Sequence, residues 1–145
     1  MSNPNPHKNI PLDKGSSAGL PYIEVVADLN LSANQKTDAV ASGVYVPAYC
    51  DVVNVTFFVE DAVESAGSTL TFAMGTDSAS DPDNFLNDEA EANIDADNDK
   101  VDGIPRLGTD NTKIAYTEAA QVYWKCGTEA PTAGRIRAKI YYLPY

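Results

Sequence analysis

Apolar and polar residues alternate along most of the chain beyond residue 21, and this period of two limits the fold more than any other feature. It is typical of β-strands that bury one face, because successive side chains of a strand point to opposite sides. Only residues 86–93 are predicted to form a helical turn or two. The alternation is clearest in four runs, at residues 22–31, 52–60, 69–74 and 135–142.

Each run has an apolar face that we expect to point into a core. These faces are Ile23, Val25, Ala27, Leu29 and Leu31; Val53, Val55, Phe57 and Val59; Leu70, Phe72 and Met74; and Ile136, Ala138, Ile140 and Tyr142. Val52 is expected on the opposite, polar face of its strand. Shorter strands are predicted at 36–41, 44–47, 112–117 and 120–126, the last with Val122 and Trp124 inward. Turns are predicted at 42–43, 66–68 and 131–134.

About eight short strands without a convincing helix predict an all-β, single-domain antiparallel β-sandwich. We expect a jelly roll, although an Ig-like sandwich would satisfy the same periodicity. The length of 145 residues suits one domain, which we place at residues 21–145. Residues 1–20 contain three prolines and a Gly/Ser run, and they are predicted to form an extended N-terminal arm. Such an arm either frays or becomes ordered against a neighbouring subunit.

The formal net charge of −11 and the pI of about 4.2 argue against a nucleic-acid partner, which requires a basic face. They equally disfavour binding to an anionic membrane. No run approaches the roughly 18 apolar residues of a membrane span, and the first residues do not resemble a signal peptide. We therefore expect synthesis and folding in a host cytoplasm, where Cys50 and Cys126 stay free and buried. A disulfide formed later, outside the cell, is the alternative.

The charge is unevenly distributed along the chain. Residues 77–102, predicted to form one long acidic loop, hold ten acidic residues and one lysine, whereas residues 103–145 hold six basic and three acidic residues. The last strand carries three cations in a row on its polar face. This asymmetry suits head-to-tail packing of copies or docking to a partner, and a solvated loop beside an ordinary polar face is the alternative. The candidate partner-binding residues are Ile10, Pro11 and Leu12 in the arm, with Arg135, Arg137 and Lys139 on the strand.

The sequence contains no recognisable catalytic motif. Its single histidine lies in the arm, and neither a phosphate-binding loop nor a zinc motif is present. We therefore expect neither enzyme activity nor a cofactor. Asp95, Asp97 and Asp99 are a candidate set of Ca²⁺ ligands, because they alternate as in a calcium-binding loop. Lys100 and Arg106, however, stand where such a loop needs Gly and Glu, so a solvated acidic loop is the preferred interpretation.

Residues 75–86 are predicted to form a structured surface connection rather than an active site. Asp77 and Ser80 can accept hydrogen bonds from nearby backbone groups, and a proline restricts the backbone between them and the next strand. We expect Phe85 and Leu86 to be buried beneath the connection.

Two segments of the chain carry a family resemblance. They are "STLTFAMGTDSASDPDNFL" at residues 68–86 and "AAQVYWKCGTEAPTAGRIRAKIYYL" at residues 119–143. In this order and spacing they resemble small virion proteins of tailed bacteriophages and related prophages, over roughly residues 44–143. The acidic insertion around residues 87–103 departs from the pattern of that group.

The resemblance implies a jelly-roll or β-sandwich protein that decorates or cements the outside of the capsid. The major capsid protein and further copies of the chain, as a homotrimer, would be its partners, and the arm would contact the capsid or a neighbouring subunit. A head-fibre or tail-associated adhesion protein is one alternative. A glycan-binding module is another, in which exposed aromatic side chains would stack on sugars; the candidates are Tyr22, Tyr123 and Tyr141.

Overall fold

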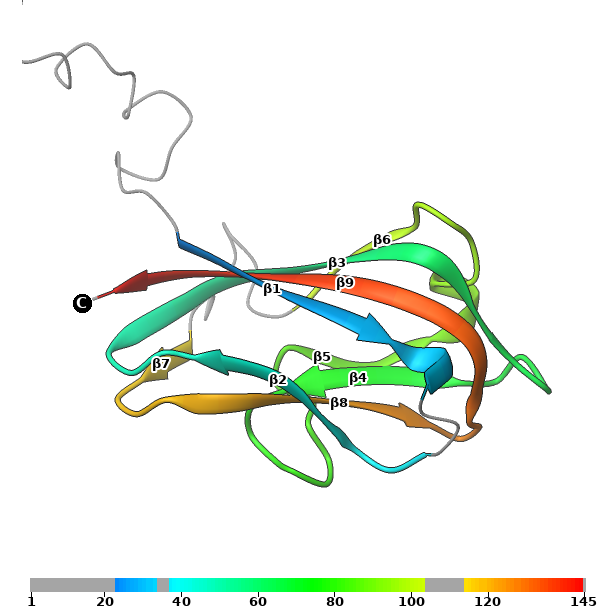
Figure 1. Cartoon of the computed structure of the whole chain (residues 1–145), viewed down its shortest axis with the longest axis horizontal. Coiled ribbons are helices and arrows are strands. Elements are labelled where there is room, and N and C mark those ends of the chain that lie inside the picture. Colours follow the sequence, from blue (N-terminus) through cyan, green and yellow to red (C-terminus); the bar gives the residue numbers. More distant parts are fainter. Residues whose placement is uncertain (1–22, 34–36, 104–113, 145) are drawn as a thin grey trace, which may run out of the picture.

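A computed structural model describes residues 23–33, 37–103 and 114–144. Nine β-strands and two short 3₁₀ helices are present in these ranges (Figure 1). The elements are β1 (Ile23–Asn30), η2 (Leu31–Ala33), β2 (Val40–Val46), β3 (Cys50–Ser65), β4 (Thr71–Gly75), β5 (Leu86–Ala90), η3 (Glu91–Asn93), β6 (Lys100–Asp102), β7 (Ile114–Tyr116), β8 (Ala120–Gly127) and β9 (Pro131–Pro144). The predicted arm at residues 1–20 lies outside the described residues.

The strands form two antiparallel sheets that pack face to face, so the predicted β-sandwich is confirmed (Figure 1). Sheet A has the order β1-β9-β3-β6, and the short strand β7 also pairs with β3. Sheet B has the order β2-β8-β4-β5. The chain changes sheet at every step from β1 to β4, and again from β5 to β6, from β7 to β8 and from β8 to β9. With β7 set aside, this is the eight-stranded arrangement of a jelly roll.

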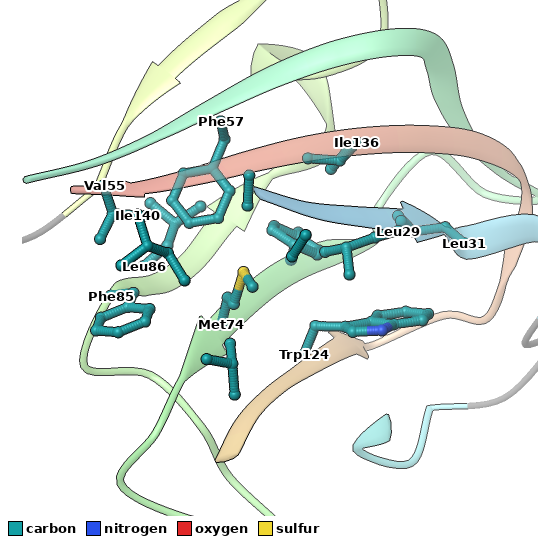
Figure 2. Packing of buried hydrophobic residues seen from close by; sticks show 14 of the residues in the cluster. Leu29, Leu31, Val55, Phe57, Met74, Phe85, Leu86, Trp124, Ile136 and Ile140 are labelled. Atoms are coloured by element: carbon teal, nitrogen blue, oxygen red, sulfur yellow. The ribbon is translucent and has the colours of Figure 1, made fainter. Parts of the chain in front are cut away.

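The apolar faces predicted from the alternation meet between the two sheets (Figure 2). Phe57 of β3, Phe72 of β4 and Ile140 of β9 have no exposed surface. The Phe57 and Phe72 rings pack edge to face, with centroids 5.8 Å apart. The prediction fails at the start of β1, where Ile23 is 43% exposed because it lies at the end of the sandwich. Aromatic and branched side chains from both sheets therefore fill one continuous core.

Two of the predicted turns are wrong, because the residues belong to bulged strands. Residues 40–46 form the single strand β2, whose register against β8 shifts between Ala41 and Tyr45. Gly43 has a φ of +78° at this shift, a conformation that glycine adopts without strain. Residues 131–134 begin β9 rather than a turn, and Gly134 has a φ of +138° where β9 meets an irregular part of β3. Glycine within a strand marked a bulge in both cases.

Two further predictions also need correction. Val52 was predicted to face outward, but a register shift between Val52 and Asn54 turns its side chain into the core, where it is fully buried. Residues 86–90 form strand β5 rather than a helical turn, since they pair with β4. Only Glu91–Asn93 is helical, as η3. The stretch predicted as one acidic loop at 77–102 therefore contains two strands and a 3₁₀ helix.

Two carboxylates tie the turn between β3 and β4 to the rest of the fold. Glu91 is only 5% exposed, and its carboxylate accepts hydrogen bonds from Ser65 N at 3.0 Å and Leu70 N at 3.0 Å. Glu129 accepts hydrogen bonds from Thr69 Oγ1 at 2.8 Å and Gly67 N at 3.1 Å. A side chain at Gly67 would collide with the Glu129 carboxylate, because a Cβ there would lie 2.6 Å from Oε1. The turn is thus held by hydrogen bonds to two carboxylates, of which the one on Glu91 is buried.

Cys50 and Cys126 are both free and buried, as the sequence predicts. Burial, together with the nearby charge of Glu91, raises the pKa of the Cys126 thiol to about 12. Burial and the charge of Asp51 also raise the pKa of Cys50. Both thiols therefore stay protonated at neutral pH, and they behave as small apolar core residues.

Candidate interaction surface

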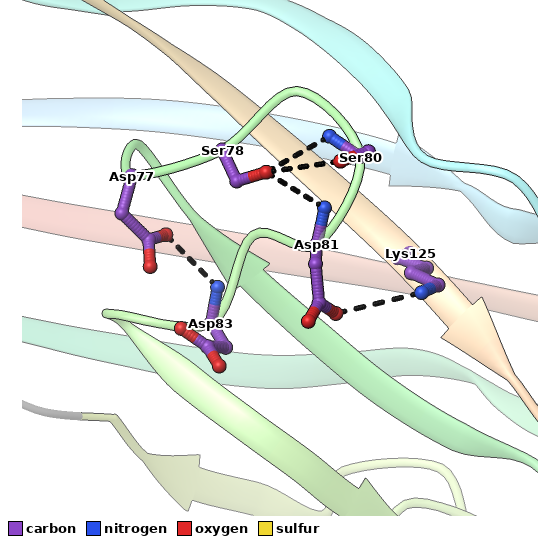
Figure 3. Close-up of polar contacts among 6 residues, drawn as sticks. All are labelled: Asp77, Ser78, Ser80, Asp81, Asp83 and Lys125. Carbon is purple, nitrogen blue, oxygen red and sulfur yellow. Dashed lines mark hydrogen bonds and ion pairs between the residues drawn. The ribbon is translucent and has the colours of Figure 1, made fainter.

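The outer face of sheet B is partly covered by the connection between β4 and β5 (Figure 3). Ala73 on this face is only 3% exposed, and Pro82 of the connection is buried. The Asp77 carboxylate accepts a hydrogen bond from Asp83 N at 3.0 Å, and Lys125 Nζ of β8 lies 3.4 Å from Asp81 Oδ1. The structured connection that the sequence predicts is therefore present, and it covers part of this face.

Hydrogen bonds inside this connection shift the pKa values of two of its aspartates. Burial acts to raise the pKa of Asp77, but the hydrogen bonds that its carboxylate accepts outweigh burial and lower the pKa. The neighbouring Asp83 has a raised pKa, chiefly because of its side-chain contact with Asp77. The serine that accepts hydrogen bonds from nearby backbone groups is Ser78 rather than the predicted Ser80. Its Oγ accepts one from Ser80 N at 3.1 Å and one from Asp81 N at 3.0 Å. Phe85 and Leu86 lie buried beneath the connection, as predicted.

The outer face of sheet A, in contrast, carries a row of charged side chains along β9. The three cations predicted on the last strand all point outward from β9, on the face opposite the buried Ile136, Ala138 and Ile140. Two of them have partners on β3: Arg137 Nη2 lies 2.5 Å from Glu60 Oε1, and Arg135 Nε lies 3.8 Å from Asp61 Oδ2. The Arg135–Asp61 pair is exposed, and pairs of this kind contribute at most about 1 kcal/mol to stability. The Arg137–Glu60 pair is more covered, since the Glu60 side chain is only 22% exposed.

A groove of ≈ 340 Å³ crosses the centre of this face. We call it the sheet A groove, and it is lined by Thr56, Phe58, Lys100, Arg137, Lys139 and Tyr141. Strand pairing explains the lining, because Thr56 lies opposite Lys139, and Phe58 lies between Arg137 and Lys100. The groove therefore surrounds an aromatic ring, 38% exposed, with three positive charges on a protein of net charge −11.

Two of the groove cations are unpaired among the described residues. Neither Lys100 nor Lys139 makes an ion pair with a carboxylate in residues 23–33, 37–103 or 114–144. Lys100 was missed as a candidate for partner binding, because in the sequence it stands inside an acidic run. Phe58 was missed for a similar reason, since it follows the buried Phe57 and reads as part of the same apolar run.

The candidate calcium ligands take part in the turn that precedes β6. Asp97 Oδ1 accepts a hydrogen bond from Ala62 N at 2.8 Å, and Asp99 Oδ2 accepts one from Ala96 N at 3.1 Å. Asp95 is exposed. Within the described ranges, no group of three His, Cys, Asp or Glu residues is arranged to hold a metal ion. The carboxylates of Asp97 and Asp99 thus fix the backbone of this turn.

Chains with this architecture occur in solved phage capsids. A chain of the cyanophage Pam1 capsid asymmetric unit matches with a TM-score of 0.61 and 21% identity, covering 85% of this chain and 85% of that chain. A chain of the acid-stable capsid of Helicobacter pylori bacteriophage KHP30 matches with a TM-score of 0.59 and 17% identity, covering 85% and 90%. The protein shares its fold with phage capsid chains. A chain of the capsid of Ralstonia phage GP4 gives a TM-score of 0.58 at 14% identity, covering 86% and 85%.

Sequence comparison alone does not find this similarity. No protein-family model matches the chain, and no curated protein matches it in sequence. In the described part of the chain, no helix is long and apolar enough to cross a membrane. Of the candidate partner-binding residues, the structure brings Arg137 and Lys139 into one groove with Lys100, and places Arg135 beside it. Ile10, Pro11, Leu12 and Tyr22 lie outside the described residues.

Proposed function

We propose that this protein is a structural protein of a bacteriophage capsid, which binds the outer surface of the shell and stabilises it as a decoration or cement protein. The observation that carries the proposal is the fold, which chains from the capsids of three phages share over 85–86% of this chain. The resemblance of residues 44–143 to small virion proteins of tailed bacteriophages agrees with this fold. In this proposal the partners are the major capsid protein and further copies of the chain, as a homotrimer.

The proposed work is mechanical, and it needs neither a catalytic residue nor a cofactor. A protein that binds only the assembled shell stabilises that shell by mass action. Stable contacts of this kind bury about 1,200–2,000 Å² of surface in total.

Cryo-electron microscopy of particles that contain this protein tests the proposal directly. We expect density for the β-sandwich on the outside of the head, over local three-fold positions, at a copy number on the scale of the capsid. Density confined to the tail or to a head fibre would replace the proposal with an adhesion role. Absence from the particle, together with binding of the isolated protein to polysaccharide, would support a glycan-binding module.

Removal of residues 1–20 is expected to weaken binding to the shell while leaving the fold intact. The described core needs none of these residues, since all of its buried members lie between Ala27 and Ile140. An arm that becomes ordered on binding adds contact area only in the complex. The measurement is co-sedimentation with shells that lack the protein, with thermal unfolding followed by circular dichroism as the control for folding.

A smaller change tests whether apolar side chains of the arm, rather than its length alone, contribute to binding. The double variant I10S/L12S keeps the length of the arm and removes two of its apolar side chains. We expect it to bind shells more weakly than the wild type and to unfold at the same temperature. Unchanged binding of both variants would show that the arm does not contact the shell, and unfolding of the truncated protein would show that the arm belongs to the domain.

A further inference from the structure

We propose that the sheet A groove binds the acidic edge of a second copy of this chain, in a head-to-tail contact. The acidic edge consists of carboxylates on β5 and in the turn before β6, and these two strands are the edge strands of the two sheets on one side of the sandwich. Its described members are Asp88, Glu89 and Asp99. The inference goes beyond the proposed capsid role, because it names the partner of one surface and holds for the protein in solution.

The groove has the chemistry of a site for carboxylates. Among the five described cations, Lys125, Arg135 and Arg137 are each close to a carboxylate of their own chain. The two that remain, Lys100 and Lys139, line the same groove. They flank Phe58, so an incoming carboxylate would be held by charge while the aromatic ring supplied apolar contact area.

The acidic edge has the complementary chemistry. A hollow of ≈ 500 Å³ on this edge is lined by the carboxylate residues Glu89, Asp99 and Asp102, together with Lys100. Asp88, which precedes Glu89 on β5, is exposed. The backbone hydrogen bonds of Asn98 to β3 and of Ile94 to η3 hold the edge in place, so its charges are presented on ordered backbone. Preorganised charge of this kind costs little ordering entropy when it binds.

The two surfaces adjoin but face different directions. Lys100 of β6 lines both the groove and the hollow, and therefore marks the ridge between them. The groove lies on the broad outer face of sheet A, whereas the acidic edge lies where β5 of sheet B and β6 of sheet A border the sandwich (Figure 1). The groove therefore does not contact the acidic edge of its own chain, and the edge that it binds belongs to another copy. A head-to-tail contact of this type forms a closed ring when the rotation between copies closes.

The net charge of −11 opposes this association only at long range. At about 0.15 M salt, charges in solvent are screened beyond about 8 Å. Opposite charges in direct contact are screened much less, and they also fix the orientation in which two copies meet. Local complementarity across the contact can therefore outweigh the repulsion between whole molecules.

Sedimentation velocity of the full-length protein at increasing concentration tests the proposal. We expect the wild type to form larger species as its concentration rises. K100E/K139E reverses the charge of the groove, and D88K/E89K reverses the charge of the edge. Each variant alone is expected to associate at least about tenfold more weakly than the wild type. Mixed in equal amounts, the two variants are expected to form a complex that contains both, because each then has one surface that matches the other variant.

Single-charge variants provide the matched control. K139E changes the groove, whereas K125E makes the same change of charge on sheet B, beside Asp81. We expect K139E to weaken self-association and K125E to leave it unchanged, with both folded by circular dichroism. A wild type that stays monomeric, a K100E/K139E variant that associates normally, or a mixture that does not associate would each overturn the proposal. Binding to shells is measured separately, so failure of self-association is distinguishable from failure of the capsid role.

Discussion

Replacement of Phe57 with Asp is expected to unfold the protein. Phe57 has no exposed surface, and it contacts Phe72 across the two sheets. Loss of a buried phenylalanine costs about 3–5 kcal/mol through the cavity it leaves, and an unpaired buried carboxylate adds several kcal/mol more. Because the whole free energy of unfolding of a domain is about 5–15 kcal/mol, this single change removes most or all of it. Circular dichroism and gel filtration of Phe57→Asp measure the outcome.

The next residue of the same strand is the control. Phe58 points to the outer face of sheet A, where it is 38% exposed and lies opposite Arg137. Phe58→Asp introduces the same charge one position along β3, and it is expected to remain folded with a change in stability of about 1 kcal/mol or less. Val55→Asp, on the buried face, should behave like Phe57→Asp. A folded Phe57→Asp protein would show that the buried face of β3 is assigned wrongly.

Replacement of Glu91 with Ala is expected to destabilise the protein by about 2–5 kcal/mol, although the change removes a charge from an acidic chain. The Glu91 carboxylate accepts hydrogen bonds from Ser65 N, Leu70 N and Ser65 Oγ, the last at 2.5 Å. Alanine leaves the two buried backbone donors, Ser65 N and Leu70 N, without this acceptor, and each unsatisfied donor costs about 1–3 kcal/mol. The Ser65 hydroxyl keeps the Glu129 carboxylate as an acceptor at 2.8 Å. Chemical denaturation of the purified variant gives the change in the free energy of unfolding.

Asp95→Ala is the matched control for Glu91→Ala. Both changes remove one carboxylate from the same acidic stretch, but Asp95 is exposed, so its removal is expected to change stability by about 0.5 kcal/mol or less. Glu91→Gln should fall between the two, since an amide retains one acceptor oxygen and places an NH₂ group against a backbone donor. Equal stabilities of Glu91→Ala and Asp95→Ala would show that the hydrogen bonds of Glu91 do not support the turn.

The alternation of residues predicted which side chains of most strands are buried, because a period of two leaves only two choices of face. It predicted neither the break at Val52 nor the continuation of β2 through Gly43, since both depend on a register shift against a distant strand. Gly134 shows the same limit. A glycine between apolar residues fits a turn and a bulge equally well, and only the pairing of β9 with β3 decides between them.

The interaction surface was predictable only in part. The row of cations on β9 followed from the alternation, because Arg135, Arg137 and Lys139 occupy successive outward positions. The sheet A groove did not, since Lys100 reaches it through the pairing of β6 with β3 across about forty residues of chain. Glu91 was hidden for a related reason. Nothing in an acidic run distinguishes the one carboxylate that backbone donors surround from its solvated neighbours.

The position of β9 in sheet A has a consequence for how the chain folds. Strand β9 lies between β1 and β3, so it supplies the partner for both the first described strand and the longest one. Sheet A therefore cannot be completed before β9 has been synthesised, about a hundred residues after β1. Pairings between the two ends of a chain close long loops, and folds dominated by them form in milliseconds to seconds rather than microseconds. Until β9 is available, β1 and β3 lack the strand that joins them in sheet A, and the complete domain cannot form.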